Sequence, residues 1–523
     1  MPVSQRRSIP ALRVICLTTA LGSIWCASYD SASAQAPAPA PVAAANATPP
    51  AAAVEKPPKE MLQGVKADGT TPIDIAPHRN KRRAQLWSVV APMFTDTNPP
   101  SAQQLDMLDT FTVWVLAEMT WPITNPNDQK DSPEYRRMYT KFRELIKAAG
   151  ADETKPALHA RINSVMLANL PAMINDKEYS IAARYNAMLL LGQLDQKEYD
   201  GPKQRPAEPL AAAEPLLIAA SQASTLPEVL RVGAFIGLAR HADLGMAPNN
   251  RPAVAAEALK MLTASAPPAG ISETGLQWIR KLSLQVVMGI SKTSGDVNRP
   301  EYVAAVVKIL ENEKQPLFLR RDAALTLGHF DPGTINAAAK PEAVVKAMTN
   351  LTIGVMRAGM PRENPNAPAD LAKGEDVLQT PTDATRKNFS ESLAYYLNSI
   401  AMGLGGRVDS KGKGLKVTAP PASTQVPKLL KTIDDIVLLV TKSTTRVDEM
   451  TSKIAAAHSD LETWAGANNL LAAPAAVAPA AAAAPAPAPG ANQPPARGAA
   501  QPGAGQVFPA NPGAIFGAPP RNQ

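Results

Sequence analysis

Cysteine is almost missing from this sequence. Its 523 residues contain two, Cys16 and Cys26, and both lie within the first 34 positions. That segment is typical of a secretory signal peptide, because arginines precede an apolar run that leads to Ala32-Ser33-Ala34, a cleavage site of small residues. The predicted mature chain has no cysteine, which excludes disulfides, thiolate metal sites and a cysteine nucleophile. We expect a secreted or periplasmic protein of the cell envelope.

Aromatic residues (5%) and charged residues (19%) are also scarce. The apolar run of the signal segment is too short to span a bilayer comfortably, and we expect no transmembrane span in the mature chain. Loss of three arginines and one aspartate with the signal peptide lowers the net charge from +7 to +5. Because this excess is small, it requires no anionic partner, and we expect no nucleic acid.

Sustained polar–apolar alternation, the pattern of a half-buried strand, is almost absent between residues 60 and 470. Apolar residues instead recur at spacings of three and four, which predicts helices nearly throughout and no sheet. Examples are a helix over 101–119 and another over 133–149, which is bounded by Ser132 and Gly150. The sequence therefore predicts an all-α fold.

Two signatures recur within the helical region. A basic residue followed by proline opens a helical stretch at Pro156, Pro206, Pro252, Pro300 and Pro341. An arginine follows downstream of each proline. The residue three positions after this arginine is usually small, and the residue seven positions after it is apolar. These arginines are Arg184, Arg231, Arg280, Arg320 and Arg386, and we expect the first four to form structural hydrogen bonds between repeats. The unit is therefore a pair of helices whose open apolar face must be covered by stacked neighbours.

Residues 320–328 (RRDAALTLG) look like the second helix of HEAT repeats, and residues 184–192 and 231–239 resemble it more loosely. The resemblance covers about 155–405. It implies a right-handed α-solenoid of the HEAT-like, armadillo type that serves as a binding scaffold, and it names no partner.

These patterns divide the chain into seven segments. They are a signal peptide (1–34), an Ala/Pro linker (35–60), an N-terminal helical cap (61–150), HEAT-like repeats (151–405, with an insertion at 358–381), a Gly/Lys/Pro linker (406–425), a long helix or helical hairpin (426–466) and an Ala/Pro/Gly tail (467–523). We expect the two Ala/Pro-rich segments to be disordered, with extended polyproline II in their Ala-Pro runs. Phe508 and Ile515-Phe516 form a candidate docking motif in the tail.

Residues 426–464 follow a heptad repeat, and two interpretations remain open. Branched residues at the a positions favour a two-stranded coiled coil between molecules, and hence a homo-oligomer. Weak positions such as Ser443 and Ala457 favour a hairpin that folds back and caps the repeats.

Catalytic and metal-binding motifs are not recognisable. The five histidines are scattered, and neither H-E-x-x-H nor G-x-S-x-G occurs. His241-Ala-Asp243 and His329-Phe-Asp331 lie one repeat apart, too far to share a metal, and we interpret them as structural. We expect no catalysis, no cofactor and no metal.

The basic residues before the five prolines suggest a binding surface for anions. Each would lie beside a helix N-terminus, where backbone donors attract anions, so that an acidic protein face or an anionic envelope polymer would fit along the row. The simpler interpretation is that they are solvated turn residues. They are Lys155, Arg205, Arg251, Arg299 and Lys340; the 358–381 insertion adds Arg362, Glu363 and Asp370 as a second candidate contact region.

These features together predict an exported, non-catalytic helical-repeat scaffold that mediates protein–protein interaction in the cell envelope. One alternative is an envelope enzyme with a site in a groove between helices. Another is a structural oligomer assembled through the C-terminal helix.

Overall fold

The computed structural model describes residues 59–78, 88–96, 98–120, 156–199, 204–360, 385–405, 414–415, 420–442 and 445–471. All of them belong to one compact unit, residues 53–471. The signal peptide, residues 35–58, the 133–149 helix, most of the 358–381 insertion, most of the 406–425 linker and the tail from 472 onward lie outside the described residues. The same holds for Lys155, Arg362, Glu363 and Asp370.

The described part of the chain is predominantly helical, as the apolar spacing predicts. The helices are η1 (Ala76–His78), α2 (Pro92–Thr95), α3 (Ala102–Glu118), α5 (Pro156–Asn175), α6 (Ile181–Leu191), η2 (Ala211–Ala213), α7 (Glu214–Gln222), α8 (Glu228–Leu244), α9 (Arg251–Thr263), α10 (Glu273–Thr293), α11 (Pro300–Glu311), α12 (Leu317–Leu327), α13 (Pro332–Ala338), α14 (Pro341–Ala358), α15 (Arg386–Gly403), α16 (Ala422–Thr441) and α17 (Val447–Ala467). Over these ranges, no helix has both the length and the hydrophobicity that a bilayer span requires.

The prediction of no sheet is wrong in two places. Strand β1 (Gln63–Val65) pairs antiparallel with β2 (Pro72–Asp74), and β3 (Asp195–Lys197) pairs antiparallel with β4 (Glu208–Pro209). Strands of two or three residues are too short for an alternating pattern to be visible in a sequence. Both pairs are small attachments to a helical structure.

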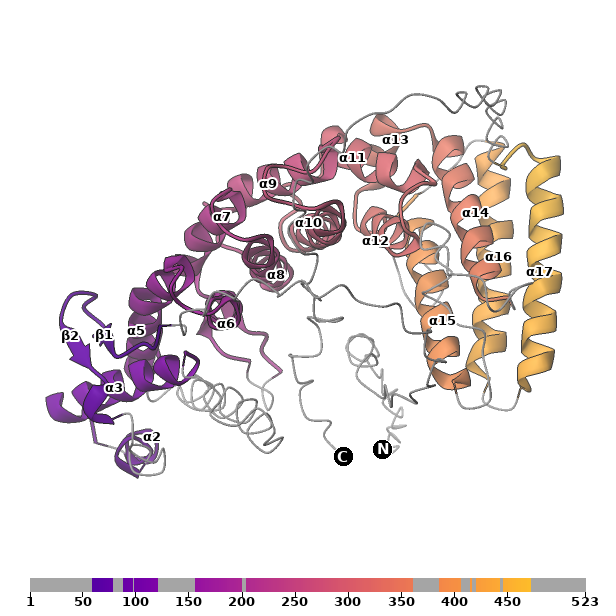
Figure 1. Cartoon of the computed structure of the whole chain (residues 1–523). Helices are drawn as coiled ribbons and strands as arrows, with labels where there is room; N and C mark the ends of the chain where they lie inside the picture. Colours follow the sequence, from indigo (N-terminus) through magenta and orange to yellow (C-terminus); the bar gives the residue numbers. More distant parts are fainter. Residues whose placement is uncertain are drawn as a thin grey trace, which may run out of the picture. The chain divides into compact units, whose positions relative to one another are not determined.

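Helix pairs repeat along the chain (Figure 1). In each of α5–α6, α7–α8, α9–α10 and α11–α12, the two helices pack against each other, and α14 and α15 form a further pair. The second helices also contact one another in succession, from α6 through α8, α10 and α12 to α15. First helices do the same from α7 through α9 and α11 to α14. The pairs therefore bury their apolar faces against neighbouring pairs, in two layers of helices.

The proline signature marks four of its five predicted helix starts, at Pro156, Pro252, Pro300 and Pro341. At Pro206 the prediction is wrong, because the chain first forms β4 and η2, and α7 begins only at Glu214. Pro215, in the first turn of α7, occupies the place expected of Pro206. Pairing of β4 with β3 thus delays the helix by eight residues relative to the basic-proline dipeptide.

Glycines allow the second helices to approach each other closely. A Cβ atom on Gly289 of α10 would lie 2.6 Å from backbone atoms of Ala242 and Asp243 in α8. Between α6 and α8, a Cβ on Gly192 would lie 2.6 Å from the Cα of Gly237. Since side chains cannot occupy such space, the helices of this layer meet backbone to backbone.

The heptad stretch folds as two helices rather than one. Helices α16 and α17 pack against each other, and both pack against α14. The residues at the a and d positions are largely buried inside the chain: Val426, Leu429, Ile433, Ile436, Val440, Met450, Ile454 and Leu461. A coiled coil between molecules would use the same surface, so it would have to displace these internal contacts.

The surroundings of His458 in α17 predict that the stability of the protein depends on pH. Burial lowers the pKa of His458, Glu462 opposes this shift, and Arg357 lowers the pKa further. In the unfolded chain the pKa is about 6.5, so the unfolded chain takes up this proton at a higher pH than the folded chain. The stability that the neutral His458 side chain contributes is present above pH 6.5 and is lost as the pH falls below that value.

We therefore expect the urea midpoint of the protein to fall between pH 7 and pH 5.5, and the His458→Gln variant to show a smaller fall. Equilibrium unfolding at several pH values measures both. Identical pH profiles for the two proteins would contradict the assignment to His458.

Candidate interaction surface

Buried arginines of the repeated signature connect the two helices of a pair. Arg184, Arg231 and Arg320 each donate from Nε to the carbonyl oxygen ten residues earlier, at or near the end of the preceding helix, over 2.9, 3.1 and 3.0 Å. Arg280 donates from Nη2 to the carbonyl oxygen of Ala264, directly after α9. Carbonyls at a helix C-terminus lack partners within the helix, and the cation complements the helix dipole there. Burial lowers the pKa of all four arginines, so these are desolvated, structural groups.

The expectation that these bonds join different repeats is mostly wrong, because each of the bonds above lies within one helix pair. Arg231 also donates to the next pair, from Nη1 to the carbonyl oxygen of Ala269 (3.0 Å). Arg386, the fifth copy, differs again: it begins α15 and donates to the carbonyl oxygen of Lys442 after α16.

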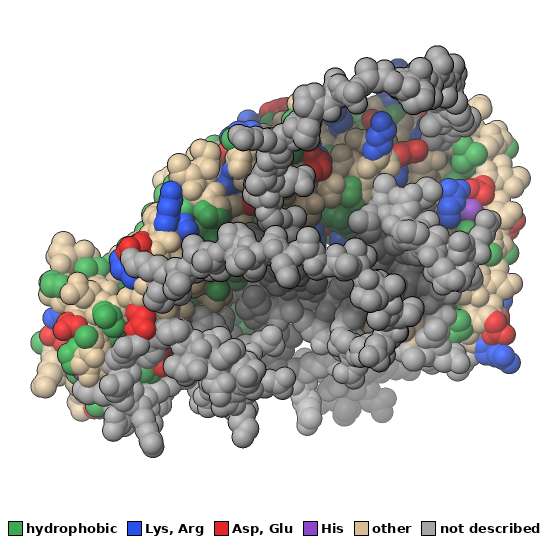
Figure 2. Space-filling model, viewed as in Figure 1, with side chains coloured by type: hydrophobic (Ala, Val, Ile, Leu, Met, Phe, Trp, Pro, Cys, Tyr) green, Lys and Arg blue, Asp and Glu red, His purple; other side chains and the backbone are tan. Residues whose placement is uncertain are grey.

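The predicted basic row is partly engaged by neighbouring acids. Arg251, the first residue of α9, donates to the carbonyl oxygen of Met246 (2.9 Å), and its Nη1 lies 3.4 Å from Asp296. Arg299 occupies the N-cap position of α11, and its Nη1 lies 3.9 Å from Glu301. On the face drawn in Figure 2, cationic and acidic side chains are interspersed over the described helices instead of forming a basic strip.

The remaining members of the row are not equivalent. Lys340 is exposed at the start of α14, as predicted. Arg205 is half-buried and precedes β4 in the chain, where the sequence predicted a helix start. The structure thus brings Arg251, Arg299 and Lys340 to helix starts but does not bring Arg205 there.

A different surface, missed by the sequence analysis, runs along the second helices. Half-buried apolar side chains recur along these helices, at spacings of three, four and seven residues in α8, α12 and α15 and of ten residues in α10. We call this set the second-helix ribbon; it comprises Tyr185 in α6, Val229, Val232 and Ile236 in α8, Trp278 and Met288 in α10, Phe318 and Leu325 in α12, and Tyr395 and Met402 in α15.

The register of the ribbon follows the anchoring arginines. Val229, Trp278 and Phe318 stand two positions before Arg231, Arg280 and Arg320, respectively. The position directly after the arginine is apolar in α6 (Tyr185) and α8 (Val232). The same position is basic in α10 (Lys281) and α12 (Arg321). The arginines point toward the first helices. Residues two positions before or one position after an arginine therefore lie on a different side of the second helix from the arginine itself.

Aromatic and cationic side chains meet in the part of the ribbon formed by α10, α12 and α15. The rings of Trp278 and Phe318 stack with centroids 6.2 Å apart, and Lys281 Nζ lies 4.8 Å from the centroid of Trp278. The guanidinium of Arg321 lies 4.7 Å from the ring of Tyr395 and 4.6 Å from that of the buried Tyr396. Cation–π contacts of this kind stabilise by about 0.5–2 kcal/mol each, so they hold the rings in place. We call Trp278, Lys281, Phe318, Arg321 and Tyr395 the aromatic cluster.

The positive charge of Arg321 in this cluster is compensated by Asp322. Arg321 donates from Nε and Nη2 to the same carboxylate oxygen of Asp322, over 2.8 and 2.5 Å. Burial lowers the pKa of Arg321, but Asp322 and the two tyrosines raise it more, so it remains above its usual value. Burial lowers the pKa of Lys281, against the opposing effect of Asp322. The cluster therefore presents ring faces and apolar edges more than free charge.

The interior polar groups in the described segments connect helices. His241 Nδ1 lies 3.3 Å from Glu214, whose carboxylate also accepts from the side chain of Asn250, so the group joins α7, α8 and the start of α9. Asp243 pairs with Lys292 of α10 instead of acting with His241. Within the described ranges, no group of three or more His, Cys, Asp or Glu side chains could hold a metal ion.

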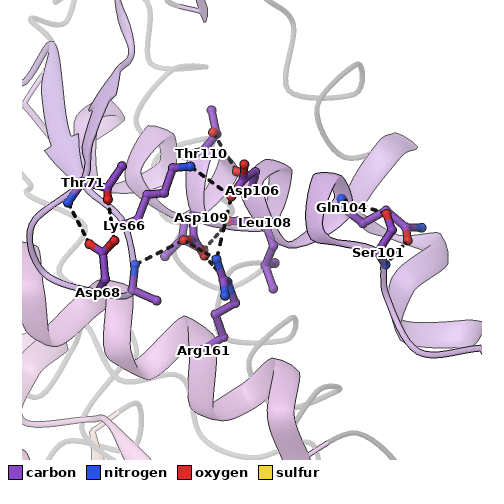
Figure 3. A network of polar contacts seen from close by, with 12 residues as sticks. Lys66, Asp68, Thr71, Ser101, Gln104, Asp106, Leu108, Asp109, Thr110 and Arg161 are labelled. Atoms are coloured by element: carbon purple, nitrogen blue, oxygen red, sulfur yellow. Dashed lines mark hydrogen bonds and ion pairs between the residues drawn. The ribbon is translucent and has the colours of Figure 1, made fainter.

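A second polar network attaches the N-terminal hairpin to the first repeat (Figure 3). Arg161 of α5 donates from Nε and Nη2 to the two carboxylate oxygens of Asp109 in α3, over 2.6 and 2.9 Å. Asp109 is fully buried and also accepts from the backbone N–H of Ala67, in the turn after β1. Lys66 pairs with Asp106 at the surface. The network is structural, because it joins three elements of the fold.

Comparison with known proteins adds no relative. No protein-family model matches this sequence, and no curated protein is significantly similar to it. The assignment of a function therefore depends on the helix pairs, the ribbon and the cluster described above.

Proposed function

We propose that this chain is an exported, non-catalytic scaffold of the cell envelope, built as a right-handed HEAT-like solenoid whose second-helix ribbon binds an extended segment of a partner protein. The continuity of the ribbon over α6, α8, α10, α12 and α15 carries this proposal. Apolar side chains that stay half-exposed on five successively packed helices cost solubility, and a partner that covers them explains their recurrence.

The dimensions of the ribbon fit an extended chain. Packed helices lie about 8–10 Å apart, so five helices in succession span roughly 32–40 Å. An extended segment rises about 3.1–3.4 Å per residue, and about ten to thirteen residues would therefore cover the ribbon. Stacked repeats commonly offer such elongated surfaces to their partners.

A double variant of the ribbon, Trp278→Ala with Phe318→Ala, tests the proposal. We expect it to retain less than a tenth of the envelope protein that the unchanged chain captures, because it removes the stacked rings at the centre of the surface. Quantitative mass spectrometry of material bound to the immobilised mature chain measures the loss.

Tyr199→Ala is the matched control, since this tyrosine is 52% exposed and lies outside the ribbon. It should capture the partner normally. If the double variant, with an unchanged circular dichroism spectrum, captured the same proteins in the same amounts as the control, the ribbon would not be the binding surface.

A further inference from the structure

We propose that the partner segment on the second-helix ribbon presents an acidic side chain, Asp or Glu, to Lys281 of α10, with apolar side chains about three residues away in both directions. The inference rests on the proposed function, because it requires that a segment lies along the ribbon. It specifies the chemistry of that segment.

Lys281 belongs to the ribbon side of α10. It stands three positions after Trp278 and seven before Met288, and these spacings place the three side chains along the same side of a helix. The Lys281 side chain is half-buried, and its Nζ lies 4.8 Å from the centroid of the Trp278 ring. Helix α10 packs against both α8 and α12. Lys281 is therefore at the middle of the ribbon.

Lys281 has no acidic partner among the residues that the structure describes. Lys292, on the same helix, pairs with Asp243 of α8 at 3.1 Å. The carboxylate of Asp322 attracts Lys281, but it is held by Arg321 at 2.5 Å. The cation of Lys281 is thus left without a counter-charge on a surface that we expect a partner to cover.

Covering this surface has a consequence for Lys281. Burial within the free chain lowers the pKa of its amine. A wholly apolar segment laid over Trp278 and Met288 would remove more water from the ammonium group, and an ammonium group without water or a counter-charge strongly opposes binding. A carboxylate at this point accepts a charge-assisted hydrogen bond from Lys281 and replaces the lost water.

The helices on either side of α10 determine what flanks the acid. In α8 the position equivalent to Lys281 is Val232, and in α12 it is Arg321, whose charge Asp322 compensates. Apolar side chains fit both places. Neighbouring helices lie about 8–10 Å apart, which an extended chain covers in about three residues. Because the ribbon continues in both directions, the acid lies within the segment and is not its terminal carboxylate.

The test selects displayed random peptides of about thirteen residues, the length that covers the ribbon, on the immobilised mature chain. We expect Asp or Glu to be enriched at one position, with apolar residues about three positions away on both sides. Lys281→Met should lose the acidic preference and keep the apolar ones, whereas Lys281→Arg should keep both. Lys308→Met, which changes an exposed lysine of the first helix α11, is the matched control and should select as the unchanged chain does.

A binding measurement then tests the contact directly. One selected peptide is compared by calorimetry with its variant in which the acid is replaced by the matching amide. The amide should weaken binding to the unchanged chain by about tenfold or more, because it leaves Lys281 covered without a counter-charge. Binding to Lys281→Met should change less than about twofold, because that chain has no charge to satisfy. Urea midpoints of the variants verify that each is folded.

Four outcomes would overturn the inference: recovery of no peptide, absence of an acidic preference, acids spread over many positions, or a preference that Lys281→Met leaves intact. Capture of the envelope partner separates this inference from the proposed function. If Trp278→Ala with Phe318→Ala abolishes capture but the selected peptides lack the acid, the scaffold proposal stands and the acidic contact is wrong. If the acidic preference depends on Lys281 but capture by the double variant is unchanged, the acidic contact stands and the scaffold proposal is wrong.

Discussion

Replacement of Arg161 by methionine should lower the free energy of unfolding by about 3–5 kcal/mol. The carboxylate of Asp109 is fully buried, and without Arg161 it would lose two hydrogen bonds and its cationic partner while it keeps the hydrogen bond from the backbone of Ala67. A buried charge without its partner is among the most destabilising changes known in proteins. Urea unfolding followed by circular dichroism measures the loss, and the N-terminal hairpin should become sensitive to protease first.

Lys66→Met provides the control for this prediction. Lys66 and Asp106 form an exposed pair in the same network, with 27% and 55% of their side chains accessible. Exposed pairs contribute about 0–1 kcal/mol, so the variant should unfold almost as the unchanged protein does. Equal losses from Arg161→Met and Lys66→Met would show that burial of Asp109 is not the cause.

Alanine at Gly289 should lower the free energy of unfolding by about 1–3 kcal/mol or more, because its Cβ would lie 2.6 Å from the backbone of α8. Gly354, inside α14, is the matched position: a Cβ there would meet only the side chain of Leu317, at 3.4 Å. Gly354→Ala should therefore stabilise by up to about 1 kcal/mol through helix propensity. Thermal unfolding of both variants gives the comparison; shifts of the same sign would contradict the backbone contact.

Much of the fold could be predicted from local features of the sequence. Apolar spacing indicates helices because one face of each helix is buried, and Pro300 and Pro341 mark helix starts because proline tolerates the first position. The arginine pattern identifies second helices, although its bonding to the paired helix became apparent only from the structure. Pro206 shows the limit, since the pairing of the two residues of β4 with β3 overrides the local signal for a helix start.

The candidate surface was harder to predict because it depends on neighbours that are distant in sequence. Arg251 resembles an anion-binding residue until Asp296, 45 positions later, is placed beside it. Trp278 and Phe318 belong to different repeats, and their stacking follows from the packing of α10 on α12. One feature of the sequence could have indicated this surface. Large apolar residues recur two positions before the arginine, although a helix face exposed to solvent would favour polar residues there.

The outer side of α17 has a consequence for assembly. It exposes Asp448, Glu449, Lys453 and Asp460, with Glu449 and Lys453 paired at 2.6 Å. A molecule made of stackable modules would polymerise head to tail into filaments if its last module presented an apolar face to the first module of another copy. Polar residues on the exposed side of α17 oppose that addition at this helix, because a partner would have to desolvate them.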